Sequence, residues 1–331
     1  MTILVTGGCG FIGSNFIRYM LNRYPDERIV NLDKLTYAGN WKNLQELSAN
    51  QNYQFNRGDI ADENLVRNIM INAKPRAIIN FAAESHVDNS IANSAPFIET
   101  NVVGTVKLLE TVKRNLNFCT TDFKFIHIST DEVYGSLETP EGSFTEETPY
   151  DPRSPYSASK AASDHFVMAY YHTHKIPVII TNCSNNYGPY QHTEKFIPTV
   201  ISKALRNEKI PVYGNGMNIR DWLYVDDHCS AIDHVLTNGR IGEKYNIGGN
   251  NECSNIDLAK KILRLMDKTE SLIEYVTDRP GHDFRYSIDN SKIVNELNWD
   301  PITDFDAGLL KTIKYYTEVT SENIRNNFSS R

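Results

Sequence analysis

The stretch "HISTDEVYGS", residues 127–136, places two carboxyl side chains next to each other directly after an apolar run. Thr130 ends that run, and Asp131 and Glu132 follow it. Because adjacent negative charges repel, the pKa of at least one of the two carboxyl groups should be raised. Two carboxyls with different protonation states can serve as a general acid and a general base, whereas a solvated turn would give them no role.

A tyrosine and a lysine four residues apart form a second candidate for proton chemistry. Tyr156 and Lys160 lie at the start of an expected helix, "SPYSASKAASDHF", where this spacing puts both on one face. A nearby ammonium favours the phenolate, so we expect that the pKa of Tyr156 can fall toward neutrality, as a base for a hydroxyl group requires. Tyr171 and Lys175 repeat the spacing roughly 22 Å further along the helix and are interpreted as helix surface.

A glycine-rich turn near the N-terminus has the pattern of a dinucleotide site. Gly7, Gly10 and Gly13 stand between an expected strand and an expected helix, where backbone N–H groups can approach a pyrophosphate. Asp33 ends the next strand about twenty residues later, where a carboxylate accepts hydrogen bonds from ribose and repels a 2′-phosphate. This favours NAD over NADP. "GDI", residues 58–60, fits a strand end near the adenine, although a structural glycine turn without a ligand would give the same pattern.

The elements that must position these residues alternate between short apolar strands and helices. The strands are "TILVTG", "RIVNLD", "YQFNRGD", "RAIINFA", "FKFIHIST" and "PVIITNC". Helices are expected at about residues 12–23, 62–73, 97–115 and 155–174. Near-continuous apolar strands separated by helices predict an α/β protein with a Rossmann-type, doubly wound parallel sheet.

After Tyr187 the sequence changes to segments interrupted by Pro and Gly, and from about residue 256 it is mainly helical. We expect a smaller, mainly helical substrate-binding lobe there. The expected division gives residues 1–187, with a return of about 222–255, to the NAD-binding domain. It gives residues 188–221 and 256–331 to the second lobe.

Composition limits the classes of function. With 331 residues, 40% hydrophobic and 23% charged, the chain is of ordinary globular type. A net charge of −7 argues against a nucleic-acid partner. The five cysteines are scattered without a C-x-x-C pair, and His172 and His174 fall on different helix faces, so no disulfide framework and no metal site are expected. No signal peptide or membrane span is expected, and cytoplasmic location is the default expectation.

Several longer motifs resemble one family. The glycine turn, "AAESHVD", a Ser/Thr at a strand end and YxxxK together resemble the extended short-chain dehydrogenase/reductases. "ISTDEVYG", "PYSASKAASDH", "TNCSNNYGPYQ", "IRDWLYVDDH" and "DRPGHDFRYSID" look like the dTDP-glucose 4,6-dehydratases within that group. The likeness runs from "ILVTGGCGFIGSNF" to about residue 316.

The resemblance implies conversion of dTDP-glucose to dTDP-4-keto-6-deoxyglucose, which feeds deoxysugar biosynthesis of the dTDP-rhamnose type. The C5 proton of a hexose becomes acidic only after C4 is oxidised, so oxidation must come first. The resemblance implies that Tyr156, assisted by Lys160 and Thr130, removes the C4 hydroxyl proton while hydride passes to NAD. It implies that Glu132 then takes the C5 proton and that Asp131 protonates the departing C6 hydroxyl.

The same resemblance implies two sets of binding residues and a homodimer that pairs through helices such as 97–115 and 155–174. The cofactor set is Gly7, Gly10, Phe11, Ile12, Gly13, Asp33, Lys34, Thr36, Asp59, Ile60, Ala82, Ala83, Ser85, Thr100, Tyr156, Lys160 and Asn186. The substrate set is Ser85, Thr130, Asn185, Lys195, Phe196, Pro211, Tyr213, Arg220, Asn255, Arg279 and His282. Bidentate recognition of a diphosphate gives the arginines a chemical reason.

One departure from the family motif and three competing functions remain open. The chain has "QHTEK" where "QFPEK" is expected, so His192 and Thr193 alter a loop near the substrate and leave the sugar-nucleotide preference open. A nucleotide-sugar 4-epimerase shares the fold and cofactor but needs no acid and base at C5 and C6. A dehydratase that acts on a UDP- or CDP-hexose is the second competing function, and an inactive NAD-binding regulatory or scaffold protein is the third.

Overall fold

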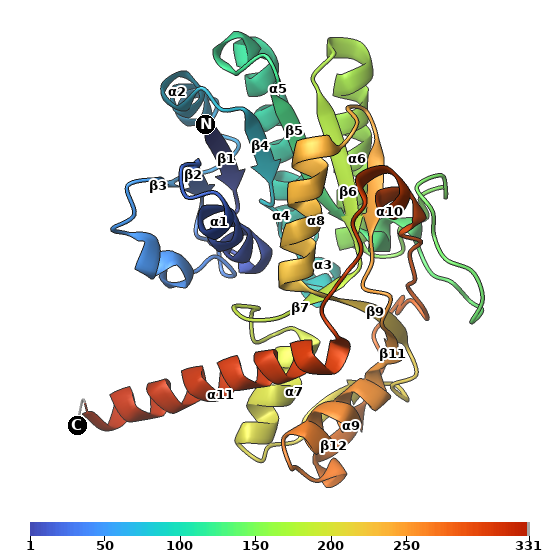
Figure 1. The fold of residues 1–331 in the computed structure, drawn as a ribbon. Helices are drawn as coiled ribbons and strands as arrows, with labels where there is room; N and C mark the ends of the chain where they lie inside the picture. The colour runs from blue at the N-terminus through green and yellow to red at the C-terminus, as the bar shows by residue number, and fades with distance from the viewer. Residues whose placement is uncertain (330–331) are drawn as a thin grey trace.

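A seven-stranded, all-parallel sheet forms the centre of the computed structural model, which describes residues 1–329 and the side-chain surroundings of residues 1–320 (Figure 1). The strand order is β10-β6-β5-β4-β1-β2-β3. The bounds are β1 Thr2–Thr6, β2 Arg28–Asp33, β3 Tyr53–Arg57, β4 Ala77–Asn80, β5 Lys124–Thr130, β6 Val178–Cys183 and β10 Lys244–Ile247. The chain leaves β1 toward β3 and returns to build β4 on the other side, which is the doubly wound order with its switch point between β1 and β4.

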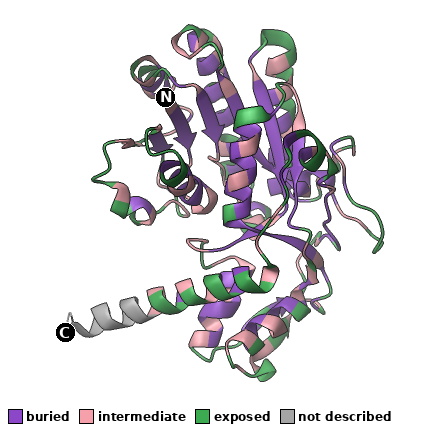
Figure 2. Ribbon diagram, viewed as in Figure 1, coloured by how far each residue is buried: buried purple, intermediate pink, exposed green. Residues whose placement is uncertain are grey.

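Helices cover both faces of this sheet, which explains why its strands are apolar on both sides (Figure 2). One core contains Ile3 and Val5 of β1, together with side chains of α1 (Phe11–Arg23), α8 (Val225–Asn238) and α10 (Ser291–Leu297). The other contains Leu4, with side chains of α2 (Glu63–Ala73), α5 (Thr105–Asn115) and α6 (Pro155–His174). Successive strand residues thus face opposite layers, and the predicted fold class is confirmed.

The helix expected over 97–115 contains a wider turn. It begins with α4 (Ala95–Phe97), continues as a π-helix over Ile98–Gly104 and then becomes α5. The buried Asn101 in this turn accepts a hydrogen bond from the Glu84 N–H at 2.8 Å and donates one to Ser159 Oγ at 2.8 Å. The π turn therefore joins the loop after β4 to α6 at the edge of the cavity described below.

The second part of the chain forms two small sheets and several helices, whereas the sequence predicted a mainly helical lobe. One sheet has the order β11-β9-β7 and the other pairs β12 with β8. Their strands are β7 Asn185–Tyr187, β8 Ile210–Tyr213, β9 Ile219–Tyr224, β11 Glu252–Ser254 and β12 Ile273–Val276. The helices α7 (Phe196–Leu205), α9 (Asn255–Leu265) and α11 (Phe305–Ser329) supply the remainder of this core. Among the described residues, no helix is both long and apolar enough to cross a membrane.

Candidate active site

The end of β5 turns directly into a short 3₁₀ helix, Asp131–Tyr134, and this turn fixes the two neighbouring carboxyls. The Thr130 hydroxyl accepts the Glu132 N–H at 3.3 Å and donates to Asp131 Oδ1 at 3.3 Å. Asp131 is only 1% exposed, and Glu132 is half-buried. Both side chains line one cavity together with Tyr156 and Thr130, so the acid pair does not face bulk solvent.

The two carboxyls have unequal surroundings. Burial raises the pKa of Asp131 well above its usual value, and the nearby Glu132 and Asp221 carboxyls raise it further. Burial also raises the pKa of Glu132, but the charges of Lys195 and Arg220 oppose that rise. Asp131 is therefore the better proton donor and Glu132 the better proton acceptor.

The Tyr156 and Lys160 side chains are both buried at the start of α6. Pro155 in the first turn and a capping box between Ser154 and Ser157 fix where this helix begins, and hence where Tyr156 lies. The Tyr156 phenol and the Thr130 side chain line the same cavity.

The expectation of a Tyr156 pKa near neutrality is wrong for the protein alone. Burial raises the pKa of Tyr156 well above 10.0, and the charges of Glu132, Cys183 and Asp131 raise it further. Burial lowers the pKa of Lys160 at the same time. The sequence argument counted the neighbouring ammonium but not the loss of water around the phenol, and burial is the larger effect.

The glycine turn has the shape that a dinucleotide phosphate requires. Gly7 has φ +69°, and a Cβ there would lie 2.6 Å from the Ala82 nitrogen. A Cβ on Gly13 would lie 2.5 Å from the Gly7 oxygen. Gly10 precedes α1 and has no side chain to cap its first-turn N–H groups, so these donors remain available to an anion at the helix N-terminus.

Asp33 lies at the carboxyl end of β2, beside this turn. Its Oδ2 accepts the Cys9 N–H at 2.8 Å, and its Oδ1 accepts the Leu35 N–H at 2.7 Å. These bonds hold a carboxylate against the cavity at the place where ribose hydroxyls would donate. Lys34 pairs with Asp59 at 2.8 Å near the same edge.

One cavity contains every residue predicted for the cofactor and all five predicted catalytic residues. Its lining includes Gly7, Gly10, Phe11, Ile12, Gly13, Asp33, Lys34, Thr36, Asp59, Ile60, Ala82, Ala83, Ser85, Thr100, Thr130, Asp131, Glu132, Tyr156, Lys160 and Asn186. These residues come from the carboxyl ends of six neighbouring strands, β3, β2, β1, β4, β5 and β6, and from the loops and helices beyond them. The sheet therefore brings together residues that are up to 179 positions apart in the sequence, from Gly7 to Asn186.

A second cavity adjoins the first and contains the remaining residues predicted for the substrate. Its lining includes Phe196, Pro211, Tyr213, Arg220, Asn255, Arg279 and His282. Glu132, Asn185 and Lys195 line both cavities, whereas Ser85 and Thr130 line only the first. A ligand in the second cavity could thus reach the acid pair.

The sequence analysis missed several residues that line the second cavity. They are His86, Val87, Asp88, Gln191, Glu194, Thr199, Trp222 and Tyr286, of which Gln191 and Glu194 also line the first cavity. The signal for three of these was present, because His86, Val87 and Asp88 lie in the "AAESHVD" motif, in which only Ala82, Ala83 and Ser85 were given roles. Tyr286 lies under Arg220, whose guanidinium carbon is 4.2 Å from the ring centroid.

The loop that departs from the family motif contacts the cofactor side of the site. His192 Nδ1 lies 3.5 Å from Glu194 Oε2, and the Tyr37 hydroxyl donates to Glu194 Oε1 at 3.1 Å. The rings of Tyr37 and His192 meet edge to face at 5.8 Å. His192 therefore connects the loop after β7 to the loop after β2, and it lines the first cavity but not the second.

Comparison with known proteins agrees with this geometry. A sequence model of the family described as GDP-mannose 4,6 dehydratase matches residues 4–312. The dTDP-glucose 4,6-dehydratase of Xanthomonas campestris pv. campestris is 54% identical over 329 residues, covering 95% of this chain and 93% of that protein. The chain belongs to the dTDP-glucose 4,6-dehydratase family.

Solved structures of this dehydratase family have the same fold. The dTDP-glucose 4,6-dehydratase of Bacillus anthracis, crystallised with NAD, is 51% identical with a TM-score of 0.89, covering 96% of this chain and 97% of that one. The dTDP-glucose 4,6-dehydratase of Streptomyces venezuelae, also with NAD bound, is 46% identical with a TM-score of 0.91 and the same coverage. The resemblance inferred from the motifs is confirmed.

Proposed function

We propose that this protein is an NAD-dependent dTDP-glucose 4,6-dehydratase, a lyase that forms dTDP-4-keto-6-deoxyglucose. The observation that carries the proposal is the unequal acid pair, Asp131 and Glu132, in one cavity with Tyr156 and Lys160. A 4-epimerase needs the phenol and ammonium but not the acid pair. Relatives named for this reaction, one of them 54% identical, support the same conclusion.

The glycine turn and Asp33 fit NAD. A Cβ at Gly7 or Gly13 would clash with the backbone, and a backbone N–H holds the Asp33 carboxylate in place beside the turn. Asp33, Lys34 and Thr36 would hold the adenosine side, and Tyr156 and Lys160 the nicotinamide side. When bound, NAD takes up a hydride from the sugar and later gives it back, so turnover consumes no cofactor.

The side chains of the chain itself move the protons. Tyr156 acts as a phenolate, which the positive charges of Lys160 and of a bound nicotinamide ring would favour, and accepts the proton of the C4 hydroxyl as C4 becomes a ketone. The ketone makes the neighbouring C5 proton acidic, and Glu132 removes it. Asp131 donates a proton to the C6 hydroxyl, which leaves as water.

The second cavity would hold the nucleotide diphosphate. Lys195, Arg220, Arg279 and His282 bring cationic or hydrogen-bonding groups into a protein whose net charge is −7. Lys195 and Arg220 also act electrostatically on Glu132. The diphosphate contacts and the base at C5 are therefore close together, so that binding of the nucleotide positions the hexose.

The cellular location, the oligomeric state and the pathway are proposals as well. We propose a cytoplasmic homodimer that acts in deoxysugar biosynthesis of the dTDP-rhamnose type. Exposed apolar side chains on the adjoining π turn and α6, Ile98, Val103 and Phe166, support the homodimer. Light scattering of the parent protein and of Phe166→Glu, which should be monomeric, tests it.

We also propose the domain division given above. Residues 1–187 with about 222–255 form the NAD-binding domain, and residues 188–221 and 256–331 form the nucleotide-sugar lobe. The composition of the main sheet supports this division. Helix α10 is an exception, because Ile293 and Leu297 pack in the core that contains β1 and α1.

Incubation with dTDP-glucose in deuterated water tests the activity. The expected product is a 4-keto-6-deoxy sugar with solvent deuterium at C5 and no net NADH. A 4-epimer without C5 exchange would indicate an epimerase, and absence of product with dTDP-, UDP- and CDP-glucose would indicate a binding protein. Tyr156→Phe, which should not oxidise C4, is the matched control.

A further inference from the structure

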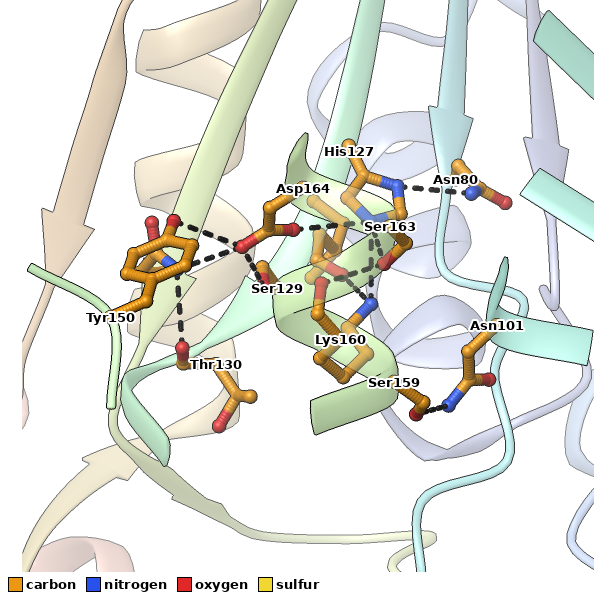
Figure 3. Close-up of polar contacts among 12 residues, drawn as sticks. Asn80, Asn101, His127, Ser129, Thr130, Tyr150, Ser159, Lys160, Ser163 and Asp164 are labelled. Atoms are coloured by element: carbon orange, nitrogen blue, oxygen red, sulfur yellow. Dashed lines mark hydrogen bonds and ion pairs between the residues drawn. The ribbon is translucent and has the colours of Figure 1, made fainter. Parts of the chain in front are cut away.

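A buried polar network lies behind the proposed catalytic residues, between α6 and β5 (Figure 3). It contains Lys160 and Asp164, which are four residues apart on α6 and are 3% and 1% exposed. Lys160 lines the cavity, whereas Asp164 does not. A buried cation and a buried carboxylate are each costly unless they are compensated, so the contacts of each group are informative.

Asp164 is held by donors from three different segments. Its Oδ2 accepts the Ser129 hydroxyl at 2.7 Å and the Tyr150 hydroxyl at 3.0 Å, and Asn182 Nδ2 lies at 3.5 Å. Ser129 belongs to β5, Asn182 to β6, and Tyr150 to the loop before α6. Burial raises the pKa of Asp164, but the Lys160 charge and these three donors all oppose that rise and favour the ionised carboxylate.

His127 lies between Asp164 and Lys160. Its Nδ1 is 3.1 Å from Asn80 Nδ2, and Asn80 Oδ1 accepts the Thr6 hydroxyl at 2.6 Å. The Asn80 amide thus presents an N–H to Nδ1, which leaves the proton of His127 on Nε2. That atom is 3.4 Å from Asp164 Oδ1, and burial together with the Lys160 charge lowers the pKa of His127 well below 6.5. His127 is neutral.

The Lys160 ammonium does not pair directly with the carboxylate. Its Nζ donates to the Ile128 carbonyl at 2.8 Å and lies 3.5 Å from His127 Nε2, and no ion pair joins Lys160 to Asp164 among the described residues. A direct pair would draw the ammonium away from the cavity. In the observed arrangement the ammonium and the carboxylate lie 3.5 Å and 3.4 Å from the same nitrogen of the neutral ring, His127 Nε2, and Lys160 stays in the lining of the cavity that contains Tyr156.

On the basis of the dehydratase activity proposed above, we propose that Asp164 is a positioning residue that supplies the buried counter-charge for Lys160, with His127 as the neutral spacer. Burial lowers the pKa of Lys160, and the Asp164 carboxylate raises it. The groups that act electrostatically on Lys160 or Asp164 are Cys183, His127, Tyr150, Tyr134 and Lys244. Burial raises the pKa of the Cys183 thiol and of both tyrosines, so these groups keep their protons, and Lys244 is a cation. Asp164 is therefore the anion that compensates Lys160.

The first test measures C4 oxidation in a single turnover as the appearance of NADH absorbance at different pH values. Asp131 acts after this step, so its ionisation does not set the profile. In Asp164→Asn the alkaline fall in rate should begin about one pH unit or more lower, because the lysine loses its proton more easily. Tyr150→Phe and Ser129→Ala each remove one hydrogen bond but keep the carboxylate, and should shift the fall by less. If the rate of Asp164→Asn is lower at every pH but begins its alkaline fall at the same pH as in the parent protein, the proposal is overturned.

The second test does not depend on the reaction. In Asp164→Asn the pKa of Lys160 in the folded protein is depressed further below its unfolded value. The variant then loses most free energy of unfolding, as measured with urea, at pH values where Lys160 is charged. This loss becomes smaller as the pH rises through the pKa of Lys160 in the folded protein. Lys160→Met combined with Asp164→Asn should lose this pH dependence. A pH-independent loss in Asp164→Asn would overturn the role of Asp164, whereas a protein inactive on dTDP-glucose that shows the trend would overturn only the proposed function.

Discussion

Arg279 forms a two-point ion pair with Asp88, with Nε 2.6 Å from Oδ1 and Nη2 3.1 Å from Oδ2. Asp88 lies in α3 (Val87–Ala92), just after β4, and Arg279 lies in the loop after β12. The Tyr213 hydroxyl also donates to Asp88 Oδ2, at 3.3 Å. The pair therefore joins two distant parts of the chain at the second cavity and holds the guanidinium at the place proposed for the diphosphate.

Arg279→Ala should weaken substrate binding more than it slows chemistry. A hydrogen bond to a charged group contributes about 1.5–3 kcal/mol, so KM for dTDP-glucose should rise about tenfold or more with little change in kcat. Steady-state kinetics measure both values. Arg206→Ala is the matched control, because Arg206 pairs with Glu208 on the surface and lines neither cavity. A fall in kcat at constant KM would place Arg279 at the reacting carbons instead.

Glu132→Gln should separate the first step from the second. The amide cannot accept the C5 proton, so incorporation of solvent deuterium at C5 should fall about 10²-fold or more while C4 oxidation stays measurable. Mass spectrometry of the recovered sugar and NADH absorbance measure the two steps. Glu138→Gln is the control, since this carboxylate pairs with Arg153 on the surface. Exchange at the parent rate would remove Glu132 from its proposed role.

Asp131→Asn should affect the loss of water rather than C5 exchange. The pKa of Asp131 is raised well above its usual value, mainly by burial, so the parent carboxyl keeps its proton to a higher pH than an ordinary aspartate and loses this function as pH rises through the raised pKa. Asparagine is not a comparable acid, so formation of the 6-deoxy product should fall about 10²-fold or more. The residual rate should no longer show the alkaline fall that Asp131 causes. Product analysis across pH, with C5 exchange as the internal control, measures both effects.

The main sheet was predictable because its strands other than β3 are buried on both faces, and such strands read as continuous apolar runs. Ile3, Leu4 and Val5 show this directly, since neighbours in sequence enter opposite cores. The π turn over Ile98–Gly104 was not predictable in the same way. A local change in the backbone hydrogen-bond spacing does not alter the spacing of apolar residues in the sequence. The short strands β8 and β12 were also missed, since each has four residues and finds its partner far along the chain.

The sequence predicted which residues form the site, but it did not predict the direction of their pKa shifts or their pairing. Motif spacing identified Tyr156 and Lys160, yet the direction of the Tyr156 pKa shift depends on burial and on Glu132 and Asp131, which only the folded chain brings near. The pairing of Arg279 with Asp88 was hidden for a related reason. The two residues are 191 positions apart, and neither motif contains a signal for the other.

The raised pKa of Tyr156 predicts how the phenol titrates in the cofactor-free protein. Tyrosinate absorbance attributable to Tyr156, obtained by subtracting the titration of Tyr156→Phe, should remain absent as pH passes the usual value of 10.0. The other buried tyrosines are common to both proteins and cancel in the difference. A difference titration near neutrality would contradict the raised pKa.

Gly10→Ala should reduce NAD binding without a comparable loss of stability. A Cβ at Gly10 would have one contact, with the Gly7 oxygen at 3.3 Å, and would otherwise project into open space at the glycine turn that lines the cavity. The methyl group therefore occupies the position proposed for the pyrophosphate, and NAD affinity should fall about tenfold or more, since each 1.4 kcal/mol of lost binding is a factor of ten. Calorimetric titration with NAD and the urea midpoint of the cofactor-free protein measure the two effects.

Gly142→Ala is the opposite control, because Gly142 has φ +80° and lines neither cavity. Alanine there should lower stability and leave NAD affinity unchanged. Undiminished NAD affinity in a stably folded Gly10→Ala would mean that the pyrophosphate lies elsewhere.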